Sequence, residues 1–144
     1  MALQTSFKNI ADNCCLAVSY LYAAFDSIAD ESEKNKTFIE VAIASTLVAG
    51  LIDDREVLTK DGYVKDAAKL MFRATNHTFH VTKKNIDKIQ DLPLDKYAVV
   101  NFEYNDHNHW VLYKGQTFLY NSVEDSVCFK YGKPTEARII SKQV

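Results

Sequence analysis

Glycine, proline and cysteine are all scarce in this chain of 144 residues, which contains four, two and three of them. So few glycines and prolines exclude a collagen-like or low-complexity segment. The hydrophobic content of 47% also excludes a disordered chain, because disordered segments lack the apolar surface that offsets the entropy lost on ordering. The length instead predicts one compact domain over residues 1–144.

The chain also has no large excess of either charge, because it contains 17 Lys and Arg and 19 Asp and Glu, which give a formal net charge of -2. Nucleic-acid phosphates require a basic face, so we expect no nucleic-acid partner. The longest apolar run, residues 38–52, has 15 residues and contains Glu40. A membrane-spanning helix needs about 20 apolar residues. We therefore expect a buried helix there and no membrane partner.

The chain has three cysteines, Cys14, Cys15 and Cys128, and this odd number does not suggest a disulfide framework. Adjacent cysteines rarely bridge each other because disulfide geometry fits them badly. Free thiols are typical of a reducing compartment, and the first residues lack the basic-then-apolar pattern of a signal peptide. We expect a cytoplasmic protein, or one released by lysis or by a dedicated secretion route.

The first half of the chain has the period of helices. Large apolar residues recur at steps of one, three and four over residues 15–28, and Asp12 or Asn13 is the expected N-cap. Further helices are expected over residues 37–49 and 64–74.

The second half has the composition of strands, with β-branched and aromatic residues in short runs. Strands are expected at residues 77–81, 97–104, 109–113, 117–121, 127–131 and 137–140, with one helical turn at 85–90. A tight hairpin turns at residues 114–116. Helices followed by an antiparallel meander predict an α+β domain.

One cysteine lies where a helix is expected to begin. The positive end of a helix and its unpaired amides stabilise a thiolate, so we expect Cys15 to have a lowered pKa. His109 opens one strand of the hairpin and Asn121 closes the other, which places them across from each other. Asn121 could then orient the imidazole toward the thiol. Each residue taken alone is more often structural, but the three together favour a Cys-His-Asn triad.

These residues carry a resemblance to a known family. The runs NCCLAVSYL (residues 13–21), HWVLY (109–113) and YNS (120–122) look like the Cys, His and Asn blocks of papain-like cysteine peptidases. The small bacterial and phage-associated branch similar to the C39-type peptidases is the nearest in pattern. The resemblance implies a papain-like fold, with an N-terminal helical half packed on a C-terminal antiparallel β-sheet, and cleavage of an amide bond.

The resemblance also implies roles for individual residues. The patterns Asn-x-Cys and Cys-x-Ala-x-Ser both select Cys15 as the nucleophile, with Cys14 as the fallback. His109 would act as acid and base, and Asn121 would orient it, with Asp125 as the second choice. The reaction would pass through a thioester and need no cofactor, and the substrate would be a peptide or a peptidoglycan-like cross-bridge.

The oxyanion hole is the least complete part of the resemblance. The family's glutamine lies about six residues before the nucleophile, and this chain has Asn9 at that position. An asparagine donates the same amide hydrogen but reaches one methylene less. Gln4 is the alternative if the intervening loop is longer, and the backbone N–H of Cys15 would be the second donor.

Two other functions stay open. His107 and His109 point to the same side of one strand and could bind a metal with Asp106 or with the pair His77 and His80. Papain-like domains also occur as binding modules without catalysis, and an asparagine in place of the usual glutamine fits such an inactive site.

Overall fold

The computed structural model describes residues 14–123 and 126–143. Its helices are α3 (Cys15–Ile28), α4 (Lys36–Val48), α5 (Ala67–Thr75) and α6 (Val127–Tyr131). Its strands are β1 (Phe79–Asn85), β2 (Tyr97–Tyr104), β3 (His107–Lys114), β4 (Thr117–Tyr120) and β5 (Lys133–Lys142). Short 3-10 turns lie at Glu31–Glu33, Leu51–Asp53 and Ile89–Asp91. The mixed α+β class with helices first is therefore confirmed.

All the strand pairs are antiparallel, in the order β1-β5-β2-β3-β4. The hairpins β2–β3 and β3–β4 follow the expected meander. The last strand departs from it, because β5 returns to lie between β1 and β2. This insertion pairs residues that are 30 to 63 positions apart in the chain, which local sequence patterns do not reveal.

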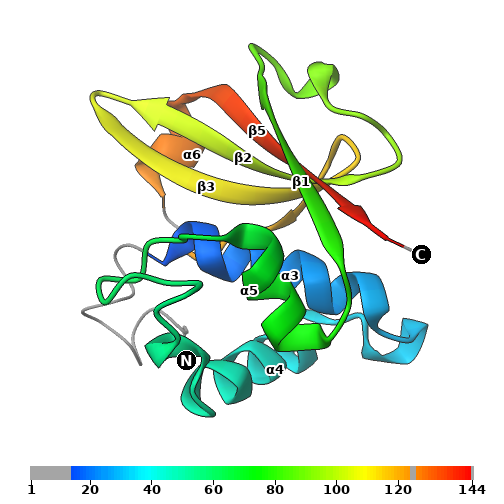
Figure 1. The fold of residues 1–144 in the computed structure, drawn as a ribbon. Helices are drawn as coiled ribbons and strands as arrows, with labels where there is room; N and C mark the ends of the chain where they lie inside the picture. The colour runs from blue at the N-terminus through cyan, green and yellow to red at the C-terminus, as the bar shows by residue number, and fades with distance from the viewer. Residues whose placement is uncertain (1–13, 124–125, 144) are drawn as a thin grey trace.

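Helices cover the two faces of the sheet unequally. In Figure 1, α3, α4 and α5 lie on one side of the sheet and the short α6 lies on the other, with α3 between the sheet and α4. The helices and the sheet face that α3 covers form a large core, which includes Tyr20, Leu21 and Leu112. A smaller core under α6 includes Phe102 and Val111.

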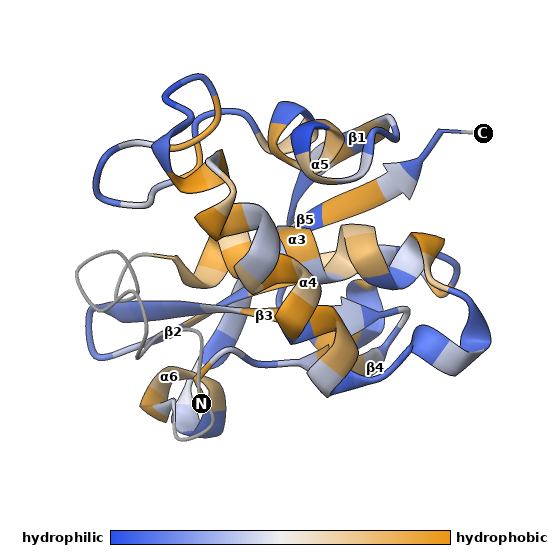
Figure 2. Ribbon diagram, turned by 90° about the horizontal axis from the view of Figure 1, so that it is seen from below, coloured by the Kyte–Doolittle hydropathy of each residue, from blue (hydrophilic) through white to orange (hydrophobic). Residues whose placement is uncertain are grey.

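The central helix α3 is buried on almost every side, which its sequence explains. Small residues, Ala17, Ala23 and Ala24, let the helix approach its neighbours, while Tyr20 and Leu21 fill the space between them. Figure 2, seen from below the sheet, colours most of α3 and α4 as hydrophobic. The apolar run at residues 38–52 lies in α4 and its following turn. None of the helices in the described ranges has the length and hydropathy of a membrane span.

One expected strand is wrong. Residues 127–131 form the helix α6, capped by Ser126, whose Oγ accepts the Phe129 N–H at 3.3 Å. The aromatic and β-branched composition suggested a strand, but Cys128 faces the core while Val127 and Tyr131 are exposed. Lys130 is also exposed, although a strand would place it on the same face as the buried Cys128.

Three element boundaries also differ from expectation. The third helix begins at Ala67 rather than residue 64, because Asp66 caps it by accepting the Lys69 N–H at 3.0 Å. Val64 instead forms an isolated bridge with Leu58. The first strand extends to Asn85, so the helical turn expected at 85–90 is reduced to Ile89–Asp91.

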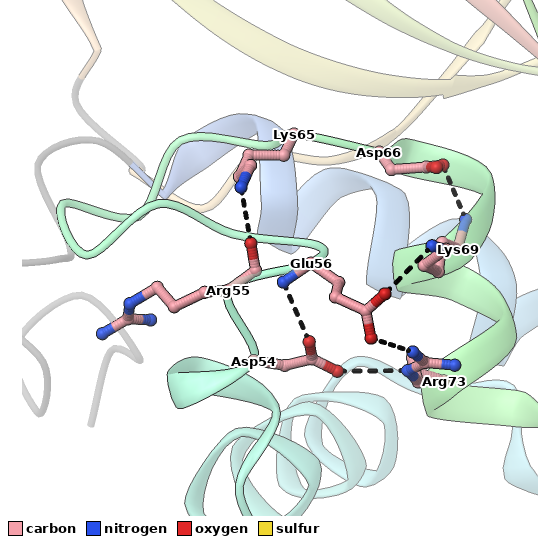
Figure 3. Close-up of polar contacts among 7 residues, drawn as sticks. All are labelled: Asp54, Arg55, Glu56, Lys65, Asp66, Lys69 and Arg73. Carbon is pink, nitrogen blue, oxygen red and sulfur yellow. Dashed lines mark hydrogen bonds and ion pairs between the residues drawn. The ribbon is translucent and has the colours of Figure 1, made fainter.

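Exposed ion pairs tie α5 to the loop before it (Figure 3). Arg73 Nε lies 3.1 Å from Asp54 Oδ2 and Arg73 Nη2 lies 2.8 Å from Glu56 Oε1, while Lys69 Nζ lies 3.4 Å from the other oxygen of Glu56. Lys65 Nζ donates to the Arg55 carbonyl at 2.6 Å. The same loop also contains Gly62, whose carbonyl oxygen lies 3.8 Å from the Cys14 sulfur.

Candidate functional site

The start of α3 presents two cysteines in different directions. Cys14 occupies the N-cap position and is buried, with its sulfur 3.8 Å from the Gly62 carbonyl oxygen. Cys15, the first residue of the helix, is partly exposed. The buried Ser19 donates to the Cys15 carbonyl at 2.7 Å one turn later. Cys14 is therefore the N-cap in place of the expected Asp12 or Asn13 and packs as a small side chain, and Cys15 is the more accessible thiol.

The β3–β4 hairpin brings His109 and Asn121 together, as its register predicted. His109 Nε2 lies 2.7 Å from Asn121 Oδ1, and both residues are buried. The Val123 backbone N–H donates to the same oxygen at 3.0 Å. A backbone N–H can only donate, so this atom of Asn121 is its carbonyl oxygen. His109 must then donate through Nε2, and in the neutral ring Nδ1 carries the lone pair.

The edge of the sheet opens beside these residues. β4 pairs with β3 only over Leu112–Lys114, and the ladder is irregular between Leu112 and Tyr113. The earlier part of β3, which carries His109 and Trp110, has no strand on that side among the described residues. Helix α3 packs against β3, and the backbone amide of Trp110 acts to lower the pKa of the Cys15 thiol. The thiol thus lies near the residue that follows His109 on β3.

The protonation of Cys15 and His109 is governed by burial. Burial raises the pKa of the Cys15 thiol above its ordinary value, although the amides of Trp110, Leu16 and Cys15 itself lower it. Burial also lowers the pKa of His109, against the hydrogen bond with Asn121. The expectation of a lowered Cys15 pKa is therefore wrong, because desolvation outweighs the helix terminus. At neutral pH both groups are uncharged.

No hydrogen bond joins the Cys15 sulfur to the His109 ring within the described ranges. The structure brings His109 and Asn121 into direct contact and holds Cys15 at the neighbouring backbone position. A catalytic contact would require the imidazole or the thiol to change rotamer, as catalytic hydrogen bonds often tighten only with substrate bound.

The titrations of the three cysteines influence one another. Burial raises the pKa of Cys14 to about 12, with a further contribution from the charge of Cys15. The charge of Cys128, buried on α6, also raises the pKa of Cys15. Sequence patterns missed this neighbour because residues 127–131 were expected as a strand.

A hollow of about 260 Å³ opens next to Asn121. Its walls come from β4, α6 and the start of α4, and its lining residues are Lys36, Phe118, Leu119, Tyr120, Asn121 and Phe129. We call it the β4–α6 pocket. The sequence carries no signal for this pocket, because Phe129 lines it from the helix that forms in place of the expected strand.

The remaining candidate residues do not gather here. Asn9, Gln4 and Asp125 lie outside the described residues. His80, near the start of β1, has its Nε2 3.0 Å from Gln143 Oε1. His107 is exposed and lies at the opposite end of the sheet. In the part of the chain that the structure describes, no three His, Cys, Asp or Glu side chains form a metal-ligand group. The metal alternative has no ligand set in these residues.

A second polar cluster, which sequence reasoning passed over, lies at the other end of α3. Asp26 is buried, accepts the Tyr97 hydroxyl at 2.5 Å and lies 3.8 Å from Lys114 Nζ. Beside it Tyr22 stacks on Tyr120 with ring centroids 4.2 Å apart. Acidic residues near helix ends usually cap or face solvent, so nothing in the sequence marked Asp26 as buried.

Comparison of the chain with protein-family models, with curated proteins and with solved structures gave no match.

Proposed function

We propose that this protein is a papain-like, cysteine-dependent amide hydrolase, with Cys15 as nucleophile, His109 as acid and base, and Asn121 as the orienting residue. The observation that carries the proposal is the double acceptance by Asn121 Oδ1, at 2.7 Å from His109 Nε2 and 3.0 Å from the Val123 nitrogen. This bonding assigns the tautomer that leaves Nδ1 of His109 unprotonated. An imidazole fixed in this way is prepared to accept a proton from a thiol.

The uncharged resting state favours general-base activation over a preformed ion pair. His109 Nδ1 removes the thiol proton as the Cys15 sulfur attacks the amide carbonyl. The oxyanion accepts hydrogen bonds from the Cys15 backbone N–H and, in this proposal, from Asn9. The imidazolium then protonates the leaving amine, which departs and leaves a thioester. Water attacks the thioester while His109 takes its proton, and the carboxylic acid and the thiol are released.

The substrate class follows from the resemblance together with the charge balance. A peptide or a peptidoglycan-like cross-bridge contains amide bonds and carries no phosphate groups. A protein with a net charge of -2 would not attract a phosphate-rich substrate. The bacterial and phage-associated branch of the papain-like peptidases acts on such bonds. The activity is proposed to need no cofactor.

The test is cleavage of a peptide library and of peptidoglycan stem peptides, read by mass spectrometry. Cys15→Ala should abolish cleavage, and His109→Ala should lower the rate by about 10²- to 10⁴-fold. Asn121→Ala should cost less than His109→Ala. His107→Ala is the matched control, because His107 is an exposed histidine two residues away on the same strand. Equal rates for His109→Ala and His107→Ala would remove His109 from the mechanism.

A second candidate is a papain-like binding module without catalysis. The raised pKa of Cys15 and the missing hydrogen bond between its sulfur and His109 favour this candidate. The two functions differ in thiol reactivity. An iodoacetamide reaction at Cys15 that is unchanged by His109→Ala across pH 5 to 9 would favour the binding module, whereas a His109-dependent rate would favour the hydrolase.

A further inference from the structure

The β4–α6 pocket shares one residue, Asn121, with the candidate triad. Asn121 lines the pocket and also holds His109. A ligand in the pocket therefore lies within one side chain of the imidazole. This adjacency distinguishes it from the hollow between α3 and α4, which is lined by Phe25, Phe38 and Ile39 and has no contact with triad residues among its lining.

The pocket offers an apolar wall. Phe118 and Phe129 stack with centroids 5.4 Å apart, and Phe118 is 47% exposed. The polar atoms beside them already have partners, since the Tyr120 hydroxyl donates to Glu40 Oε2 at 2.6 Å and Asn121 Oδ1 accepts two hydrogen bonds. Exposed apolar residues also follow the pocket in the chain, namely Val123, Val127 and Tyr131. A surface segment this apolar beside a site is typical of ligand binding.

The order of the triad decides which part of a substrate the pocket would meet. In the proposed reaction the acyl carbon is attached to the Cys15 sulfur, and the leaving amine receives its proton from His109. In the proposed triad, Cys15 faces one nitrogen of the His109 ring and Asn121 binds the other. Because Asn121 contacts the imidazole that protonates this amine, we assign the pocket that it lines to the side of the leaving amine.

We infer that the β4–α6 pocket binds a large apolar side chain, aromatic or branched aliphatic, on the residue that follows the scissile bond. A volume of about 260 Å³ accommodates one such side chain. This inference rests on the proposed function for the direction of the substrate. The apolar character rests on the pocket itself.

Acyl transfer measures the leaving-group side directly. A nitrophenyl ester of an N-acetylated amino acid forms the thioester at Cys15 with release of nitrophenol. An added amino-acid amide then attacks the thioester carbonyl through its amine, His109 takes the amine proton, and the sulfur departs as the thiol. We expect L-phenylalaninamide to capture the acyl group about tenfold more efficiently than L-alaninamide, relative to hydrolysis.

Two matched variants separate the pocket from general surface effects. Phe118→Ser should reduce this preference to about twofold or less, while Phe72→Ser should keep it, because Phe72 is similarly exposed at 42% but lies on α5. Circular dichroism checks that both variants are folded. An unchanged preference in Phe118→Ser, or no preference in the unaltered protein, overturns the inference.

A binding measurement separates failure of the inference from failure of the proposed function. In Cys15→Ala, which cannot react, L-phenylalaninamide should shift the backbone amide signals of residues 118–121 and Phe129, and L-alaninamide should shift them much less. Such shifts without any ester turnover in the unaltered protein would reject the hydrolase and retain an apolar binding pocket. Ester turnover without such shifts would retain the hydrolase and overturn the pocket assignment.

Discussion

The two ends of α3 show opposite ways of placing polar groups in a protein interior. At the C-terminal end, Asp26 is fixed by the Tyr97 hydroxyl at 2.5 Å and by Lys114 Nζ at 3.8 Å. At the N-terminal end, burial raises the pKa of the Cys15 thiol, and nearby backbone amides act in the opposite direction. The first arrangement is a buried carboxyl group with two polar partners, and the second is a thiol that burial keeps neutral.

The difference has a consequence for function. A buried carboxylate with good partners contributes a rigid anchor between the helix and the sheet, and it cannot easily change partner. A partly exposed neutral thiol loses little when it leaves its contacts, so it can meet a substrate. Helix α3 is therefore anchored through Asp26 at its C-terminal end, and the Cys15 thiol at its N-terminal end is able to react.

Removing the anchor should have the largest effect. Asp26→Ala should lower the free energy of unfolding by about 3 kcal/mol, because the Tyr97 hydroxyl and Lys114 lose their buried partner. Urea denaturation measures the loss. Asp26→Asn keeps an acceptor for Tyr97 and should cost less, while Asp53→Ala, whose side chain is 82% exposed, should cost almost nothing. Equal costs for Asp26→Ala and Asp53→Ala would contradict the anchor.

The reactive end should differ from the anchor in chemistry rather than in stability. Iodoacetamide at pH 8 should modify Cys15 at least about tenfold faster than Cys14 or Cys128, because Cys15 is partly exposed and the pKa of Cys14 is about 12. The rate at Cys15 should still rise above pH 9, since its pKa lies above the ordinary value of 9.0. Peptide mass spectrometry follows each cysteine. A plateau below pH 8 would instead indicate a stabilised thiolate.

The hydrogen bond between Asn121 and His109 should have a smaller, measurable effect on titration. Burial holds the pKa of His109 below 6.5 and the bond to Asn121 raises it, so Asn121→Ala should lower the pKa further. Ring-proton NMR shifts measure it. Because the folded pKa is lower than the unfolded value, the unfolded chain binds more protons below pH 6.5, and stability should fall as the pH drops. A raised His109 pKa in the variant would contradict the bonding.

The smallest effect should come from the exposed pairs of α5. Arg73→Ala removes contacts at 3.1 Å and 2.8 Å to Asp54 and Glu56, yet its side chain is 39% exposed. Water and salt screen such pairs. The urea midpoint should shift far less than in Asp26→Ala, and 0.5 M NaCl should remove most of the difference. A shift as large as that of Asp26→Ala would show that surface pairs, not the buried anchor, hold the helices.

Local patterns predicted much of the fold. The bounds of α3 agree with the expected residues 15–28, and the β3–β4 hairpin places Asn121 beside His109 as its turn length required. Helical period and hairpin register are properties of neighbouring residues, so the sequence carries them directly. The catalytic roles of Cys15, His109 and Asn121 stay predictions.

The failures lie where distant segments meet. Residues 127–131 form the helix α6 and not the predicted strand, because the packing of Cys128 outweighs their β-like composition. The strand β5 lies between β1 and β2 and not at the end of a meander. The raised pKa of Cys15 depends on how much protein covers the sulfur, which the helix-start position does not reveal. The same holds for the burial of Asp26.

By itself the sequence determined the α+β class, the central helix and the His109–Asn121 pair, because each depends on residues close in the chain. Only the tertiary structure decided three things: the neutral state of Cys15, the anchor at Asp26 and the apolar pocket beside Asn121. Each of these depends on what packs against a side chain from elsewhere in the chain. The scarce cysteines show the division, since their number excluded a disulfide framework but only the fold separated a packed Cys14 from an accessible Cys15.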